Sequence, residues 1–204
     1  ISSSKIQTSN ITSSIIASVV PSSLQNLILL CKKYFNCNPQ IVGNPNINLG
    51  IKVKLKNPDE VGADRLVNAV AAHQSYKGPM IIIDFGTATT FDVIDTNGNY
   101  LGGVIAPGVN LSLETLHKSA AQLPRIDIKH TKSVIGKNTI EAMQSGIYWG
   151  YISLIEGLIN RLSLEYGKKI NVIATGGLAS MFIEGTKFID HFDPDLTVNG
   201  LLLI

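Results

Sequence analysis

The sequence predicts an α/β protein built around mixed β-sheets. The second half of its 204 residues opens with three strands joined by short turns and continues as helices alternating with strands. An antiparallel meander followed by that alternation is the order that gives a mixed sheet covered by helices. Hydrophobic residues make up 45% of the chain and charged residues 16%, which is ample for a buried core and excludes a disordered chain.

The first half of the chain shows strands and helices in alternation, without an opening meander. The first ten residues are polar and are expected to form a loop. Ser22 and Ser23 are candidate N-caps of the first helix. The expected elements are a buried strand over 15–20, a helix to about 35, a short strand over 40–42, an edge strand over 51–55 and a helix over about 60–76.

Lys77-Gly78-Pro79 should end that helix and is the best candidate for a domain boundary, which gives domains over 1–77 and 78–204. Beyond it we expect strands over 80–84, 89–94, 100–105 and 171–174, helices over about 111–119 and 139–166, and a short helix after 177. The long helix could break at Gly146 or Gly150. The order predicts a ribonuclease-H-like layer. If both domains follow one plan, the first lacks its opening strands.

Asp84 to Thr90 is the segment with the clearest chemistry. Asp84 ends a buried strand and is followed by a turn that contains Gly86 and Thr87. Such a turn presents a carboxylate, backbone N–H groups and a hydroxyl together, which suits a phosphate group and a cation. The alternative is a hairpin whose Asp and Thr only satisfy the turn.

Gly62-Ala63-Asp64-Arg65 is expected at the start of a helix, where free N–H groups and partial positive charge favour an anion. Asp64 could act as a general base on a hydroxyl, and Arg65 could hold a carboxylate or phosphate. The alternative is that Asp64 caps the helix and Arg65 forms a solvated ion pair.

Gly176 lies in Thr175-Gly-Gly177, between an expected strand and helix, where a backbone without side chains can approach a nucleotide or form an ordinary turn. Thr139 begins the long helix and could simply cap it. A net charge of +2 and few aromatic residues argue against nucleic acid binding, and no apolar run is long enough to span a membrane. Cys31 and Cys37 are expected to be reduced thiols of a cytoplasmic protein.

Together these segments resemble the type III pantothenate kinases, from about residue 15 to 204. The resemblance lies in the segments 18–21, 57–58, 60–69, 84–90, 102–103, 105–108, 138–139 and 175–177. That family belongs to the superfamily of acetate and sugar kinases, heat-shock ATPases and actin. The resemblance therefore implies two actin-like ATPase domains of ribonuclease-H-like topology, the first without the opening strands and the Asp-x-Gly-Asn-Thr phosphate turn that the family shows.

The resemblance implies ATP-dependent phosphorylation of pantothenate to 4'-phosphopantothenate, the first step of coenzyme A biosynthesis. ATP, magnesium and a monovalent cation, potassium or ammonium, are the implied cofactors. Asp84 matches the family's monovalent-cation ligand. Thr87 matches a threonine that contacts ATP, and Gly86 and Gly176 are expected beside the nucleotide.

The same resemblance implies the substrate site. Asp64 matches the catalytic base, and the turn from Gly62 through Ala63 to Arg65 matches the pantothenate-binding turn. Thr139 matches a threonine that contacts pantothenate across the interface of a homodimer. Two alternatives stay open: a non-catalytic binding or regulatory relative of the same fold, and a kinase for another small hydroxylated substrate.

Overall fold

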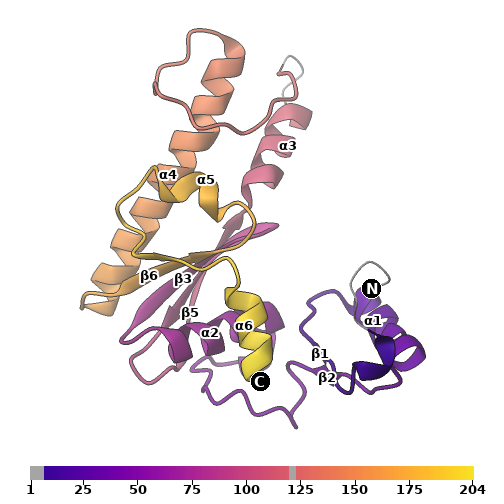
Figure 1. Cartoon of the computed structure of the whole chain (residues 1–204). Coiled ribbons are helices and arrows are strands. Elements are labelled where there is room, and N and C mark those ends of the chain that lie inside the picture. Colours follow the sequence, from indigo (N-terminus) through magenta and orange to yellow (C-terminus); the bar gives the residue numbers. More distant parts are fainter. Residues whose placement is uncertain (1–6, 120–122) are drawn as a thin grey trace.

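A five-stranded mixed sheet is the centre of the computed structural model, which describes residues 7–119 and 123–204 (Figure 1). Its strands are β3 (Met80–Phe85), β4 (Ala88–Ile94), β5 (Tyr100–Pro107), β6 (Asn171–Thr175) and β7 (His191–Phe192). The strand order is β5-β4-β3-β6-β7. The first three strands form an antiparallel meander, and β6 and β7 run parallel to β3. The ribonuclease-H-like layer predicted for the second half is confirmed.

Helices cover both faces of this sheet because successive side chains of a strand point to opposite sides. Ile81, Ile83 and Phe85 pack with α4 (Thr139–Tyr166) and α5 (Ala179–Ile183) in one buried cluster. On the other face, alternate residues of β3 pack with α2 (Ala63–Ser75) and with the start of α6 (Leu196–Leu203). The remaining helix of this half is α3 (Val109–Ser119), which follows β5 directly.

The long helix α4 runs without interruption through Gly146 and Gly150, so neither expected break occurs. The side chain of Asn138 caps the helix, because its Oδ1 accepts a hydrogen bond from the Glu141 N–H at 2.9 Å. Gly167, with φ of 77°, ends it in the left-handed conformation that favours glycine. Packing of its apolar residues on the sheet outweighs the cost of three glycines within the helix, Gly146, Gly150 and Gly157.

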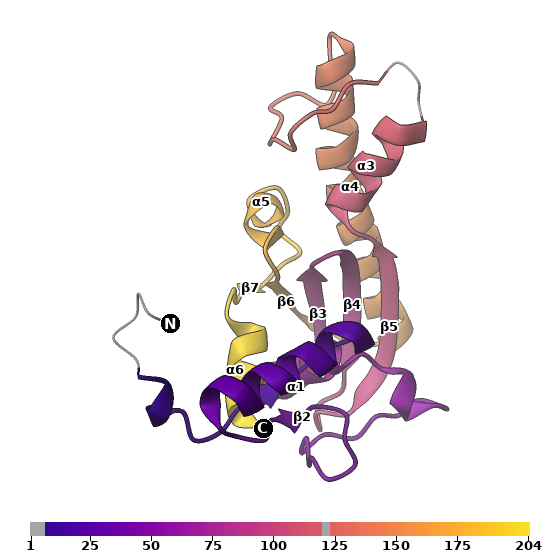
Figure 2. The same cartoon turned by 90° about the vertical axis from the view of Figure 1, so that its right-hand side faces the viewer.

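The first half follows the predicted alternation of strand and helix, on the side of the molecule away from α4 (Figures 1 and 2). Strand β1 (Ile15–Ile16) pairs in parallel with β2 (Gln40–Ile41), and α1 (Pro21–Phe35) connects them. A short 3₁₀ helix, Pro58–Glu60, precedes α2. Of the expected N-terminal loop, residues 7–10 end in a 3₁₀ turn, and residues 1–6 lie outside the described part of the chain.

Several boundaries predicted for the first half are wrong. The strand expected to reach Val20 ends at Ile16, and the Ser18 hydroxyl accepts the Val20 N–H at 3.2 Å, a local bond that bends the chain. Val20 is the N-cap of α1 because Pro21 takes the first helical position, so neither Ser22 nor Ser23 is the cap.

The strand expected over 51–55 forms only one isolated bridge, between Val53 and Tyr100. Two elements were not predicted, β7 and α6. Strand β7 is two exposed residues long, and α6 is apolar on most of its sides, so neither shows a clear period. Within the described residues, no helix combines the length and the apolar character needed to cross a membrane.

Candidate active site at the first turn of α2

The first turn of α2 carries the predicted substrate turn on the sheet face that Asp84 and Asp92 share. Gly62 is the N-cap of α2 and has no side chain with which to accept a hydrogen bond. A side chain at Gly62 would bring a Cβ within 2.6 Å of Asp64 Oδ1, so glycine leaves the carboxylate its space. Asp64 is half-buried, and its Oδ1 accepts the backbone N–H of Arg65 at 2.9 Å. Asp64 therefore helps to cap the first turn of α2, as the alternative expected, and this bond uses one of its two carboxylate oxygens.

Arg65 forms a buried ion pair with Asp92 of β4. Its Nη2 lies 2.6 Å and its Nε 2.8 Å from Asp92 Oδ1. The side chain of Arg65 is 16% exposed and that of Asp92 is fully buried. The solvated ion pair considered from the sequence is therefore wrong, since solvent does not reach the carboxylate. Removing one partner of such a pair typically costs about 3–5 kcal/mol of folding free energy.

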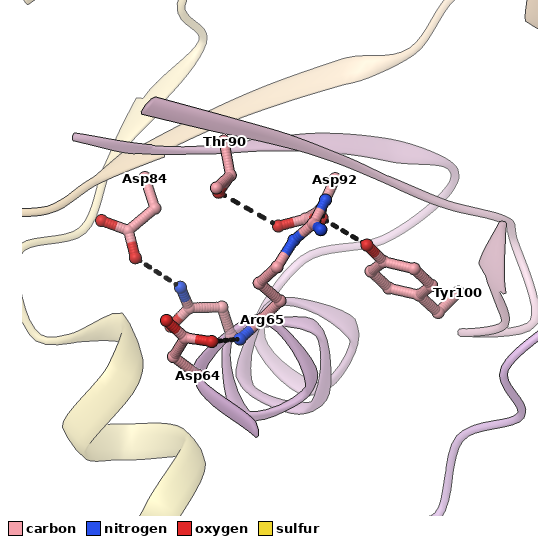
Figure 3. A network of polar contacts seen from close by, with 7 residues as sticks. Asp64, Arg65, Asp84, Thr90, Asp92 and Tyr100 are labelled. Atoms are coloured by element: carbon pink, nitrogen blue, oxygen red, sulfur yellow. Dashed lines mark hydrogen bonds and ion pairs between the residues drawn. The ribbon is translucent and has the colours of Figure 1, made fainter. Parts of the chain in front are cut away.

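Two further side chains hold Asp92 in place (Figure 3). The Tyr100 hydroxyl donates to Oδ1 at 2.6 Å, and the Thr90 hydroxyl donates to Oδ2 at 3.4 Å. The guanidinium carbon of Arg65 lies 5.7 Å from the centre of the Tyr100 ring, within range of a cation–π contact. Asp92 thus accepts bonds on both oxygens and cannot turn without losing them.

Burial and charge act against one another in this cluster. Burial raises the pKa of Asp92. The hydrogen bond and charge of Arg65, together with the hydrogen bonds from Tyr100 and Thr90, oppose that rise. Burial alone would lower the pKa of Arg65, but the hydrogen bond and charge of Asp92 outweigh it and the net shift is upward. Burial, together with the charge of Asp92, raises the pKa of Tyr100, which keeps its hydroxyl a donor.

Asp84 lies on the same face of the sheet as Asp92. The residue of β3 opposite Asp92 is Ile82, and Asp84 follows it by two positions. Its Oδ2 accepts a hydrogen bond from Asn68 Nδ2 of α2 at 3.0 Å, and Asn68 Oδ1 accepts one from the Thr197 hydroxyl of α6 at 2.7 Å. Burial raises the pKa of Asp84; the bond from Asn68 opposes this rise, and the charges of Asp64 and Asp92 add to it. A bound cation would relieve that cost.

The parallel pairing of β3 with β6 brings Gly176 to Asp84. Asp84 is the register partner of Thr175, so the glycine that follows lies beside the end of β3. Gly176 has φ of 93°, and a Cβ there would lie 2.6 Å from the Phe85 nitrogen. Only a residue without a side chain permits this approach. Gly86 and Thr87, at the exposed turn between β3 and β4, complete the group expected near the nucleotide.

Thr139 does not join this cluster within one chain. It is the exposed first residue of α4, and Figure 1 shows that end of the helix at the opposite end of the molecule from α2. Asn138 supplies the cap of α4, so the alternative role of Thr139 as a cap is wrong.

The sequence reasoning missed Asp92, Tyr100 and Asn68. One signal was present, because Asp92 interrupts the apolar run of β4 with a charge. A charge at a strand position flanked by apolar residues requires a partner, but the partner's identity depends on the docking of α2. The aromatic Tyr100 and the amide Asn68 gave no comparable signal.

Asp84 is the residue of this site that could hold a cation. Within residues 7–119 and 123–204, no three His, Cys, Asp or Glu side chains are grouped so as to hold a metal ion. Asp84 offers one carboxylate charge, and its bond from Asn68 occupies only part of the capacity of a carboxylate to accept. Magnesium usually keeps several waters and binds through substrate phosphates, so it needs few protein ligands.

Comparison with known proteins identifies relatives along nearly the whole chain. Residues 2–161 match the family model described as type III pantothenate kinase. The type III pantothenate kinase of Rhodospirillum rubrum is 62% identical over 195 residues, covering 96% of this chain and 76% of the relative. That of Paramagnetospirillum magneticum is 58% identical, covering 96% of this chain and 75% of the relative.

Two solved structures share the fold at low sequence identity. A putative Baf family transcriptional activator from Campylobacter jejuni has a TM-score of 0.64 at 19% identity, over 94% of this chain and 81% of its own. The ethanolamine utilization protein EutJ from Carboxydothermus hydrogenoformans has a TM-score of 0.50 at 14% identity, over 89% and 72% respectively. At such identities the similarity concerns the fold alone.

The raised pKa of Asp84 predicts a pH-dependent stability difference between the native chain and Asp84→Asn. In the unfolded chain this carboxyl ionises near its ordinary pKa of about 3.9. Above that pH the folded chain still binds a proton at Asp84 that the unfolded chain has released. The free energy of unfolding of the native chain therefore falls as the pH rises towards the folded-state pKa of Asp84. The variant lacks this loss and should gain stability relative to the native chain over that interval.

Urea unfolding at a series of pH values between about 4 and 8 measures this difference, with tetramethylammonium as the only monovalent cation. Asp92 is present in both proteins, so the comparison removes most of its contribution. Stability curves that stay parallel across the interval would contradict the raised pKa of Asp84.

Proposed function

The chain belongs to the type III pantothenate kinase family, and we propose how its residues carry out the reaction of that family. The enzyme transfers the terminal phosphoryl group of ATP to the terminal hydroxyl of pantothenate, in the first step of coenzyme A biosynthesis. The observation that carries the residue assignment is the convergence of Asp64, Arg65 and Asp84 at the first turn of α2. Phosphoryl transfer depends mainly on positioning and on charge stabilisation, and these are the kinds of group that provide both.

Asp64 is the general base. Its Oδ1 is engaged by the N–H of Arg65, which fixes the carboxylate at the helix start and leaves Oδ2 to accept the proton of the substrate hydroxyl. The small residues Gly62 and Ala63 let the substrate approach the turn closely. A base held in this way needs no movement before the proton is transferred.

Arg65 binds the carboxylate of pantothenate. Asp92 takes up Nε and one position on Nη2, and the side chain keeps 16% of its surface exposed, so N–H donors remain for a ligand. Guanidinium pairs with carboxylates through parallel N–H donors, which fixes the orientation of the substrate as well as its position.

Asp84 binds a potassium or ammonium ion. The site holds three carboxylates, Asp64, Asp84 and Asp92, and one guanidinium, which pairs with Asp92, so the group is negative when all are ionised. Both substrates are anions, and a monovalent cation at Asp84 reduces the repulsion between them and the cluster. Such an ion supplies positive charge near the transferred group without taking part in proton transfer.

ATP binds beside Gly86, Thr87 and Gly176. The exposed turn offers the Thr87 hydroxyl to phosphate oxygens, and Gly176 packs its backbone against the end of β3, beside Asp84. Magnesium accompanies ATP and is held mainly by its phosphates and by water.

The enzyme works as a homodimer in which Thr139 of one chain completes the pantothenate site of the other. Two observations support this arrangement. Thr139 lies far from Asp64 of the same chain, and it matches a substrate-contacting residue of the family. The exposed side chain of Ile140, next to Thr139 on α4, gives such a pairing apolar surface to bury.

We also retain the division into domains over 1–77 and 78–204 as a proposal, together with a cytoplasmic location. Helix α2 then belongs to the first domain and reaches across to the sheet of the second. The use of ATP and the free thiols of Cys31 and Cys37 support the location.

Replacing the proposed base should abolish turnover without preventing binding. Asp64→Asn keeps the shape of the side chain and removes its basicity, so kcat should fall by ~10²–10⁴-fold while the KM for pantothenate changes little. Steady-state measurement of pantothenate-dependent ADP release tests this. Asp59→Asn, an exposed carboxylate just before α2, is the matched control and should leave kcat unchanged. Full turnover by Asp64→Asn would exclude this residue as the base, and a native chain that binds pantothenate without phosphorylating it would favour the non-catalytic alternative.

Potassium should stabilise the native chain through Asp84. At a concentration of ~10 times its dissociation constant, an ion that binds only the folded state adds about 1.4 kcal/mol. Thermal melting in potassium against tetramethylammonium chloride should therefore show a higher Tm for the native chain and for Asp59→Asn, but not for Asp84→Asn. Activation of turnover by potassium should disappear in the same variant. An undiminished potassium effect in Asp84→Asn would place the ion elsewhere.

Heterodimers can test whether Thr139 acts across the interface. A purified dimer of one Asp64→Asn chain and one Thr139→Ala chain contains one intact shared site, so it should show about half of the native activity at low pantothenate concentration. A dimer of one native chain and one chain with both substitutions contains no intact shared site and should be nearly inactive. The reverse pattern would show that both residues act within one chain.

A further inference from the structure

Asp92 carries a buried negative charge that the proposed reaction does not use directly. It lies in the middle of β4, with Ile82 of β3 and Gly103 of β5 as its partners on either side. Charged side chains are rarely buried to this degree unless they are paired. All of its hydrogen bonds from side chains come from three residues, of which Arg65 is the only one proposed to touch a substrate.

We propose that Asp92 is the positioning residue for Arg65 and thereby determines the affinity of the site for the carboxylate of pantothenate. This inference rests on the proposed role of Arg65. Of the five N–H donors of a guanidinium, Asp92 takes one on Nε and one on Nη2. Both donors of Nη1 remain. The edge of the guanidinium formed by Nε and Nη2 is therefore held against the sheet, and Nη1 is left for the ligand.

Hydrogen bonds to the side chain of Asp92 and to the backbone of β4 make this arrangement rigid. Tyr100 donates to the same oxygen that binds Arg65, and Thr90 donates to the other oxygen. Because β4 is hydrogen-bonded on both sides, the backbone of Asp92 cannot shift independently of the sheet. The guanidinium is thus held before the substrate arrives, and the entropy of ordering a long, flexible side chain is not lost on binding.

A positioning role and a purely structural role make different kinetic predictions. If Asp92 only fastens α2 to the sheet, its replacement should lower stability and leave the remaining folded enzyme with normal affinities. If it positions Arg65, Asp92→Asn should raise the KM for pantothenate by ~10-fold or more, since a charge-assisted pair is lost. The KM for ATP should change by less than about twofold, and kcat should fall less than the pantothenate KM rises, because Asp64 is unaltered.

A double-mutant cycle with Arg65→Gln tests the proposal on the full chain, with thermal melting recorded for each protein. Arg65→Gln should raise the pantothenate KM, and Asp92→Asn should add little in that background because the two residues act as one unit. The double variant, which leaves no unpaired buried charge, should melt higher than Arg65→Gln yet keep its high KM. If the pair were merely structural, the recovery in Tm would be accompanied by a recovery in the pantothenate KM.

Tyr100→Phe provides a milder variant should Asp92→Asn fail to fold. It removes one hydrogen bond to Asp92 and keeps both the aromatic ring and Arg65. We expect it to raise the pantothenate KM by ~2–5-fold. If Arg65→Gln raises the KM whereas Asp92→Asn and Tyr100→Phe do not, or if the effects of Arg65→Gln and Asp92→Asn simply add, the positioning role is overturned and the proposed function stands. If Arg65→Gln itself leaves the KM unchanged, the proposed role of Arg65 fails, and the role of Asp92 fails with it.

Discussion

The buried ion pair between Arg65 and Asp92 is the contact on which the geometry of the site depends. It ties the first turn of α2 to the central sheet, so the position of Asp64, the preceding residue, follows from that of Arg65. An ion pair of this kind contributes little net stability, because desolvation of the charges offsets their attraction. Its effect on geometry is to join the helix start to one point of β4.

The arrangement of charge would favour a cation beside Asp84. The guanidinium of Arg65 pairs with Asp92, whereas the charges of Asp64 and Asp92 act on Asp84, and burial makes the ionised form of Asp84 costly. Water cannot screen these charges as it does at the surface. A site that must accept two anionic substrates therefore gains from positive ions that bind with them. The same carboxylate that is costly in the empty protein becomes favourable once a cation lies beside it.

Sheet topology brings together groups that are distant in sequence. The parallel pairing of β3 and β6 puts Gly176 beside Asp84, and α6 reaches the same point from the end of the chain through Thr197 and Asn68. Parallel strands expose their carboxyl ends at one edge, where turns can converge around a ligand. A single polar residue of α2, Asn68, thereby connects the C-terminal helix with the expected cation ligand.

The sequence by itself determined most of the order of strands and helices, the mixed sheet of the second half, and the family, because hydrophobic periodicity and the spacing of short segments are local properties. It also identified Asp64, Arg65 and Asp84 as chemically distinctive. Only the tertiary structure decided that Arg65 pairs with Asp92, that Asn68 bonds to Asp84, and that Thr139 lies away from both. These contacts join residues far apart in the chain, and their partners are chosen by the docking of helices on the sheet, which no local pattern encodes.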